Sequence, residues 1–120
     1  MAAELHRFGI MFQGVAANFE HYMTLLSARQ KLVASNLANA DTPGYRTEDI
    51  DFHTEFEHAM SGQNPTVIEP DGLEVKPDGN NVDLDREARL LSENTMRFAV
   101  ASNLARAELS SLKAAIQEGK

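Results

Sequence analysis

The sequence contains no cysteine, and this absence removes several classes of function at once. A disulfide-stabilised scaffold, a thiol nucleophile and a cysteine-based zinc site all need the missing side chain. Basic residues are also scarce, because 11 Lys and Arg stand against 18 Asp and Glu for a formal net charge of −7. Proteins that bind nucleic acid or an anionic membrane surface normally show the opposite balance. We therefore expect no nucleic-acid partner.

Long hydrophobic runs are missing as well. No stretch approaches the roughly 20 apolar residues of a membrane span, and Met1–Ile10 lacks the apolar run of a secretory signal. We expect no direct membrane insertion, and any export to proceed without a cleavable signal peptide. A chain of 120 residues, 42% of them hydrophobic, forms at most one domain with a small core.

What is present is a helical pattern near the start. Over residues 19–41, apolar side chains recur three and four apart, which predicts an amphipathic helix; they are Tyr22, Leu25, Leu26, Leu32, Val33, Leu37 and Ala40. Residues 1–18 are also rich in apolar side chains, but Gly9 and Gly14 each weaken a helix by about 1 kcal/mol relative to Ala. We expect residues 1–18 to form a marginal helix or to order only on assembly.

The middle of the chain, residues 42–81, favours an irregular loop region. It contains all four prolines and four of the seven glycines. The sequence Thr42-Pro43-Gly44-Tyr45 predicts a type II turn, with Tyr45 directed back to pack or to bond through its hydroxyl. A short helical turn is expected within Asp51–Met60. A small β-hairpin is expected where Thr66–Glu69 and Leu73–Val75 are joined by Pro70-Asp71-Gly72.

Residues 82–120 predict a long second helix. Asp83 is a plausible N-cap, and Gly119 ends the pattern. A seven-residue repeat then gives two rows three and four apart, as in a coiled-coil seam; the rows are Leu91, Phe98, Ala105 and Leu112, and Ala88, Thr95, Ser102, Leu109 and Ile116. The expected fold is therefore mainly α, with long N- and C-terminal helices in a coiled-coil-like hairpin or bundle around the loop region.

The first helix is shorter than the second and leaves part of this seam uncovered. An antiparallel two-helix hairpin with a loop module is one outcome. We favour a second, in which other copies or related subunits bury the rest of the seam.

Two asparagines border the apolar stripe of the first helix. One interpretation of Asn36 and Asn39 is that they fray the helix end and give its carbonyls partners. The other is a buried or interfacial amide that fixes register between helices. Both interpretations stay open at the level of sequence.

Candidate catalytic and metal-binding patterns fail on spacing. The segment His53–His58 places its histidines five apart, whereas a zinc-protease helix needs them four apart. A calcium loop starting at Asp78 would need glycine at its sixth position, where Asp83 stands. We interpret both as polar surface or turn chemistry, and expect no enzymatic activity, no metal and no cofactor.

One longer pattern is specific. The segment Ala28–Tyr45, ARQKLVASNLANADTPGY, resembles the N-terminal signature shared by flagellar rod, hook and related axial proteins. The resemblance covers nearly the whole chain from about Phe19 onward. Further segments resemble the proximal rod subunits of that family in particular. They are DIDF (Asp49–Phe52), GNNVDLDRE (Gly79–Glu87), Glu93-Asn94, Arg97-Phe98 and Leu112–Ile116.

The resemblance implies a structural subunit that assembles through its terminal helices with other copies of itself and with sister rod proteins. It further implies a place in the periplasmic rod, beside the export gate and base ring, after export through the flagellar type III apparatus. The alternative is a soluble helical adaptor or export chaperone that binds another protein's helix. The expected interaction residues are Leu25, Leu32, Asn36, Leu37, Asn39, Leu91, Phe98, Leu109, Leu112 and Ile116.

Overall fold

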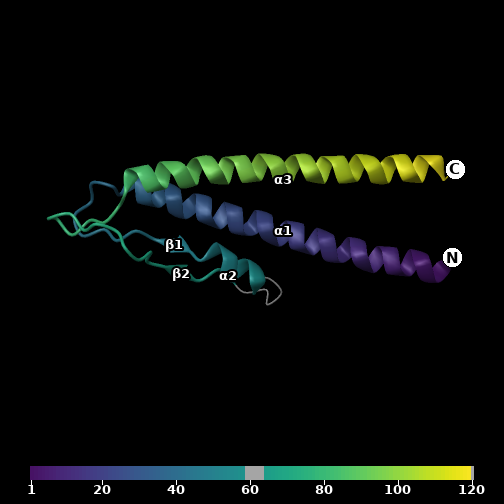
Figure 1. The fold of residues 1–120 in the computed structure, drawn as a ribbon, viewed down its shortest axis with the longest axis horizontal. Helices are drawn as coiled ribbons and strands as arrows, with labels where there is room; N and C mark the ends of the chain where they lie inside the picture. The colour runs from purple at the N-terminus through teal and green to yellow at the C-terminus, as the bar shows by residue number, and fades with distance from the viewer. Residues whose placement is uncertain (59–63, 120) are drawn as a thin grey trace.

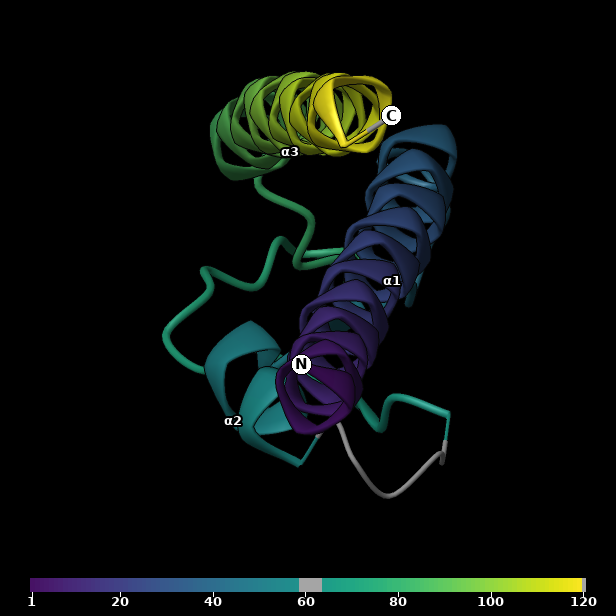
Figure 2. The same ribbon diagram turned by 90° about the vertical axis from the view of Figure 1, so that its right-hand side faces the viewer.

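Two long antiparallel helices dominate the molecule. A computed structural model describes residues 1–58 and 64–119, with α1 at Ala2–Ala38 and α3 at Leu84–Glu118. The helices lie close together where α1 ends and α3 begins, and diverge towards the other end, where both termini lie (Figure 1). Seen from that end, α3 lies above α1, and the smaller α2 lies beside α1 (Figure 2). The mainly helical architecture is confirmed, in a molecule measuring 68 × 25 × 17 Å.

Local sequence sets the bounds of α3. The Asp83 side chain accepts a hydrogen bond from the Arg86 backbone N–H at 3.1 Å, so the predicted N-cap is confirmed. Asp85 and Glu87 follow in the first turn, where negative charge offsets the positive end of the helix dipole. Gly119 is the C-cap.

The first helix is continuous, although residues 1–18 and residues 19–41 were expected to be separate segments. It begins at Ala2 and passes through Gly9 and Gly14, at which an added side-chain carbon would meet nothing within 4 Å. No packing contact requires a glycine at either position. The ordering of residues 1–18 in the isolated chain stays a prediction.

A small antiparallel sheet lies in the middle segment, but its strands are not the expected ones. β1 (Asp49–Ile50) pairs with β2 (Val67–Ile68), with Asp49 opposite Ile68 and Ile50 opposite Val67. The predicted pairing of Thr66–Glu69 with Leu73–Val75 is therefore wrong. Asp49 and Ile50 are buried beside α1, so β1 offers a supported edge, whereas an isolated two-stranded hairpin is marginal in water.

Between these strands lies α2 (Phe52–Glu57), which confirms the short helix expected there. The predicted end of that helix, Met60, lies outside the described residues. Tyr22 of α1 contacts Phe52 and Phe56 edge-on, with ring centroids 5.6 and 6.0 Å apart. These aromatic contacts hold α2 against α1. The Arg97 guanidinium of α3 lies 5.8 Å from the centroid of the Phe52 ring, so α2 also approaches α3.

The core is small and lies in the half of the hairpin where the helices meet. The buried apolar residues are Leu25, Leu26, Val33, Ala40, Ile50, Val82, Leu90 and Ala101. Almost as many polar side chains are buried with them: Asn36, Thr47, Asp49, Asn80, Asn81, Glu87 and Asn94. Hydrogen bonds therefore share with apolar packing the task of joining the helices to the middle segment.

Candidate assembly surface

The contact between the long helices contains polar groups at its centre. The α3 residues buried there are Glu87, Leu90, Asn94 and Ala101, spaced three, four and seven apart along one face. Asn94 Nδ2 donates to the Leu26 carbonyl and to Gln30 Oε1, both at 2.9 Å. A buried amide that bonds across two helices fixes how they align along their length.

A cluster of four charged side chains joins α1, β1 and α3. Arg29 donates to both carboxylate oxygens of Asp49, at 3.1 and 3.0 Å, and Arg86 donates to the same carboxylate. Arg86 also donates to Glu87 Oε1 at 2.7 Å. Two cations and two anions thus neutralise one another at a partly buried site. Among the described residues, Glu87 Oε2 has no hydrogen-bond partner.

Asn36 connects α1 to the returning chain. Its Nδ2 donates to the Glu48 carbonyl at 2.8 Å, and its Oδ1 accepts from the Glu48 N–H at 3.0 Å. The same oxygen accepts from the Tyr45 hydroxyl at 2.9 Å. The side chain is completely buried, so Asn36 is a register-fixing amide, but it acts between the helix and the middle segment.

Asn39 instead provides a hydrogen-bond partner at the end of the helix, which was the other interpretation of these asparagines. Its Nδ2 donates to the Ser35 carbonyl at 2.9 Å, which gives a carbonyl in the last turn of α1 a partner. The next residues form the predicted turn: the Tyr45 N–H donates to the Thr42 carbonyl at 3.2 Å, and Gly44 has φ +75°. A type II turn requires positive φ at its third position, which Gly44 occupies directly after Pro43.

Two further asparagines connect the end of α1 to the middle segment, in the region that we call the junction. Asn80 Nδ2 donates to the carbonyls of Asn39 and Thr42, both at 2.9 Å, and so caps the end of α1. Asn81 Oδ1 accepts from the Thr47 N–H at 2.6 Å. The roles of Asn80 and Asn81 were not predicted from the sequence. The available signal was the pair of adjacent asparagines just before the N-cap of α3, but nothing local indicates that Asn80 reaches the end of α1 instead.

A stripe of α3 remains largely uncovered. We call Leu91, Phe98, Leu109, Leu112 and Ile116 the α3 stripe. Each residue of a helix turns by about 100°, which places the α3 stripe roughly 60° around the helix from the face that contacts α1. Phe98 is 49% exposed, Leu109 53% and Ile116 57%, whereas Leu91 and Leu112 are half-buried.

Apolar side chains of α1 are exposed near its start. Where the helices diverge, a groove of about 690 Å³ lies between them. Val15 and Phe19 of α1 and Val100 and Leu104 of α3 line it, with Phe56 of α2 at its side. The exposed apolar residues before the groove are Leu5, Phe8, Ile10, Met11 and Phe12.

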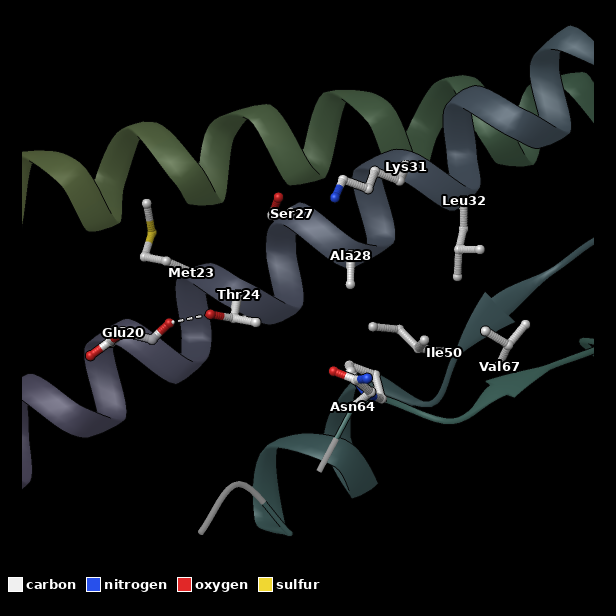
Figure 3. Close-up of a pocket in the computed structure, with 11 residues that line it drawn as sticks. Glu20, Met23, Thr24, Ser27, Ala28, Lys31, Leu32, Ile50, Asn64 and Val67 are labelled. Atoms are coloured by element: carbon white, nitrogen blue, oxygen red, sulfur yellow. Dashed lines mark hydrogen bonds between the residues drawn. The ribbon is translucent and has the colours of Figure 1, made fainter. Parts of the chain in front are cut away.

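The expected interaction residues of α1 have different surroundings. Leu25 is completely buried within the molecule and offers no surface to another subunit. Leu37 is half-buried. Leu32 is half-buried and, with Ala28, faces Ile50 and Val67 across a groove of about 570 Å³ between α1 and the small sheet (Figure 3). Leu32 thus borders the middle segment.

The described residues show no group that would support catalysis or metal binding. They contain no cluster of three or more His, Asp or Glu side chains able to hold a metal ion. His53 Nε2 lies 3.1 Å from Glu57 Oε1, one turn further along α2, at the surface. No helix within these residues has the length and apolar character needed to cross a bilayer.

A long helical hairpin with exposed apolar helix ends is typical of a structural subunit. The family profile described as "Flagella basal body rod protein" matches residues 23–46, which contain Asn36 and the junction turn. The chain is 31% identical to the flagellar basal body rod protein FlgB of Salmonella typhimurium, over 81% of this chain and 88% of the relative. It is 30% identical to that of Borrelia hermsii, over 69% and 81%. The Bacillus subtilis protein is 24% identical over 92% and 98%.

These similarities extend well beyond the short signature. The chain belongs to the FlgB family of flagellar basal body rod proteins. It is therefore a structural protein of the flagellar basal body, and not an enzyme. Assembly with other rod and basal-body components follows from membership of this family.

Proposed function

We propose that the protein builds the proximal part of the rod and polymerises through its terminal helices, with the α3 stripe as an assembly surface. Other copies of the chain and sister rod proteins are its partners. The observation that carries this proposal is the exposure of large apolar residues along the far halves of both helices.

The exposed residues are numerous and ordered. Phe98, Leu109 and Ile116 repeat at the spacing of a helix-packing seam, yet about half of each side chain faces solvent. Burying such side chains contributes roughly 1.5–3 kcal/mol each when burial is complete. Contiguous exposed apolar surface of this kind marks interaction sites. A neighbouring helix is the partner whose side chains match that spacing.

The location completes the proposal. We infer that the subunit sits in the periplasmic rod beside the export gate and base ring, and that it arrives through the flagellar export apparatus without a cleavable signal peptide. Family membership supports this placement, and the predominance of helix suits subunits that pack side by side. In this arrangement Asn36, Asn39 and the turn from Thr42 to Tyr45 act inside each subunit and hold the middle segment in place.

A double substitution in the α3 stripe tests the assembly surface. Phe98→Asp with Leu112→Asp places two charges where apolar packing is proposed, and should abolish swimming and recovery of the chain in basal bodies. Secretion of the subunit should persist, because neither side chain is fully buried in the single molecule. The measurement is motility together with immunoblotting of basal bodies and of culture medium.

The matched control keeps the added charge and moves it around the helix. Asn103→Asp with Ala107→Asp changes two exposed α3 residues on the side opposite the stripe. This variant should swim and enter basal bodies normally. If the stripe variant assembles as well as the control, the α3 stripe is not an assembly surface.

A further inference from the structure

Charge is segregated along the chain. Residues 39–87 contain thirteen acidic and three basic residues, a net charge of −10. Residues 1–38 contain three basic and two acidic residues, and residues 88–120 contain five basic and three acidic ones. The overall charge of −7 therefore conceals an acidic middle segment between weakly cationic helices.

The three cations of the middle segment are all engaged within the molecule. Arg46 pairs with Glu69 at 2.7 Å, and Lys76 Nζ donates to the Ala40 carbonyl at 3.3 Å. Arg86 binds Asp49 and Glu87. Asp71 and Glu74 are exposed and form no ion pair within the part of the chain that the structure describes. Glu74 directly precedes Val75, whose side chain is 50% exposed, and Asp71 lies four residues before it.

The opposite arrangement occurs on the far half of α3. Arg106 and Lys113 lie three before and four after Leu109, so they form the edge of the α3 stripe next to that residue. Both are exposed, and within the described residues neither forms an ion pair. The stripe therefore has a cationic border on this side, while the exposed Glu108 lies on its other side. The middle segment offers exposed apolar surface next to acidic residues.

These two surfaces cannot meet within one molecule. The 25 residues from Leu84 to Leu109 span roughly 38 Å of helix. Residues 39–83 of the middle segment precede the start of α3, and the far half of α3 leads away from them (Figure 1). A second copy that points in the same direction and is not displaced would bring like charges together, which is unfavourable.

We propose that the acidic middle segment of one copy docks on the cationic edge of the α3 stripe of a second copy that is displaced along the long axis. This inference rests on the proposed assembly function and adds the register of the contact. Asp71 and Glu74 of one copy lie opposite Arg106 and Lys113 of the next. The two copies point in the same direction, so each pair keeps one surface of each kind free and the contact repeats along an axis.

Charge reversal with rescue tests the register. In a flagellated strain that carries this chain in place of its own rod subunit, Arg106→Glu with Lys113→Glu should lower incorporation into basal bodies on the order of tenfold. Adding Asp71→Lys with Glu74→Lys on the same chain should restore it, since every subunit then carries the inverted pair. Failure of the rescue, or normal incorporation of the first variant, overturns the inference.

Cysteine cross-linking gives an independent readout, because the natural chain has none. Ser110, which lies between Arg106 and Lys113 on the helix surface, and Val75 are replaced by Cys on one purified full-length chain. Oxidation should give a ladder of multimers that fades at high salt. A closed dimer from this chain, or dimers from Ser110→Cys alone, indicates a different alignment and overturns the inference.

The two proposals fail in different ways. If the unchanged chain does not enter basal bodies, the assembly function itself is wrong. If the unchanged chain enters and the Arg106→Glu, Lys113→Glu variant enters equally well, only the proposed register is wrong.

Discussion

At the scale of single residues, polar side chains at the junction hold the middle segment against the end of α1. The sequence could place Asn36 at the border of the apolar stripe, but it could not reveal its partners. Those partners, the backbone of Glu48 and the hydroxyl of Tyr45, depend on how the chain returns after the turn. An asparagine side chain offers the same donor and acceptor as a peptide group, so Asn36 pairs with Glu48 much as a neighbouring strand would.

Replacing Asn36 should be costly. Asn36→Leu leaves the Glu48 N–H and carbonyl without a partner and removes one of the two contacts of the Tyr45 hydroxyl, which also lies 3.2 Å from Ser35 Oγ. It should lower the free energy of unfolding by about 3 kcal/mol. Asn39→Ala is the comparison, and should cost about 1 kcal/mol because it mainly removes a helix-end bond. Urea unfolding followed by circular dichroism measures both. Equal losses for the two variants would contradict the central role of Asn36.

Asp51, the N-cap of α2, has a shifted titration. The Thr54 hydroxyl and backbone N–H donate to its carboxylate at 2.9 and 3.3 Å, and hold the pKa of Asp51 below its ordinary value of 3.8. The capping contribution is therefore complete above pH 3.8 and is lost as the pH falls through the lowered pKa. Carboxyl chemical shifts followed by NMR should show this, and Thr54→Val should move the pKa of Asp51 upwards. An unshifted Asp51 in the unchanged chain would contradict the cap.

At the scale of elements, the seven-residue repeat predicted the second helix well but not the face that meets the first. The predicted rows contain Leu91 and Phe98, whereas the face buried against α1 contains Glu87 and Asn94. A search for apolar periodicity passes over a contact made partly by an amide and a carboxylate. The partners of Asn94, which are the Leu26 carbonyl and Gln30, are known only once the helices are aligned. The two faces are neighbours, so α3 can contact α1 and still present the stripe.

The uneven packing of the helices predicts uneven protection from hydrogen exchange. In dilute monomer, amides of residues 25–36 and 87–101 should exchange slowly, because the buried core lies there. Amides of residues 2–18 and 105–118 should exchange much faster, since their apolar side chains are largely exposed. Exchange measured by mass spectrometry, with and without assembly, tests this. Strong protection of residues 2–18 in the dilute monomer would show that they do not depend on a partner for order.

At the scale of the whole molecule, local signals were reliable and distant pairings were not. The turn at Pro43-Gly44, the cap at Asp83 and the short helix at Phe52–Glu57 depend on neighbours in sequence, and all three were predictable. The partner of β2 lies eighteen residues earlier in β1, and α1 supports that strand. The roles of Asn80 and Asn81 likewise depend on the approach of Gly79, whose added Cβ would lie 3.4 Å from Gly44 Cα.

The small, half-polar core has a consequence for how temperature acts on the isolated subunit. The heat capacity change of unfolding increases with the apolar surface that becomes exposed, and exposed polar surface lowers it. Among residues 1–58 and 64–119, eight apolar residues are buried beside seven polar ones, so that change should be small for a chain of this length. The stability curve is then broad and shallow, so the monomer loses little on cooling and gains most of its resistance to heat from the neighbours that cover its helix ends.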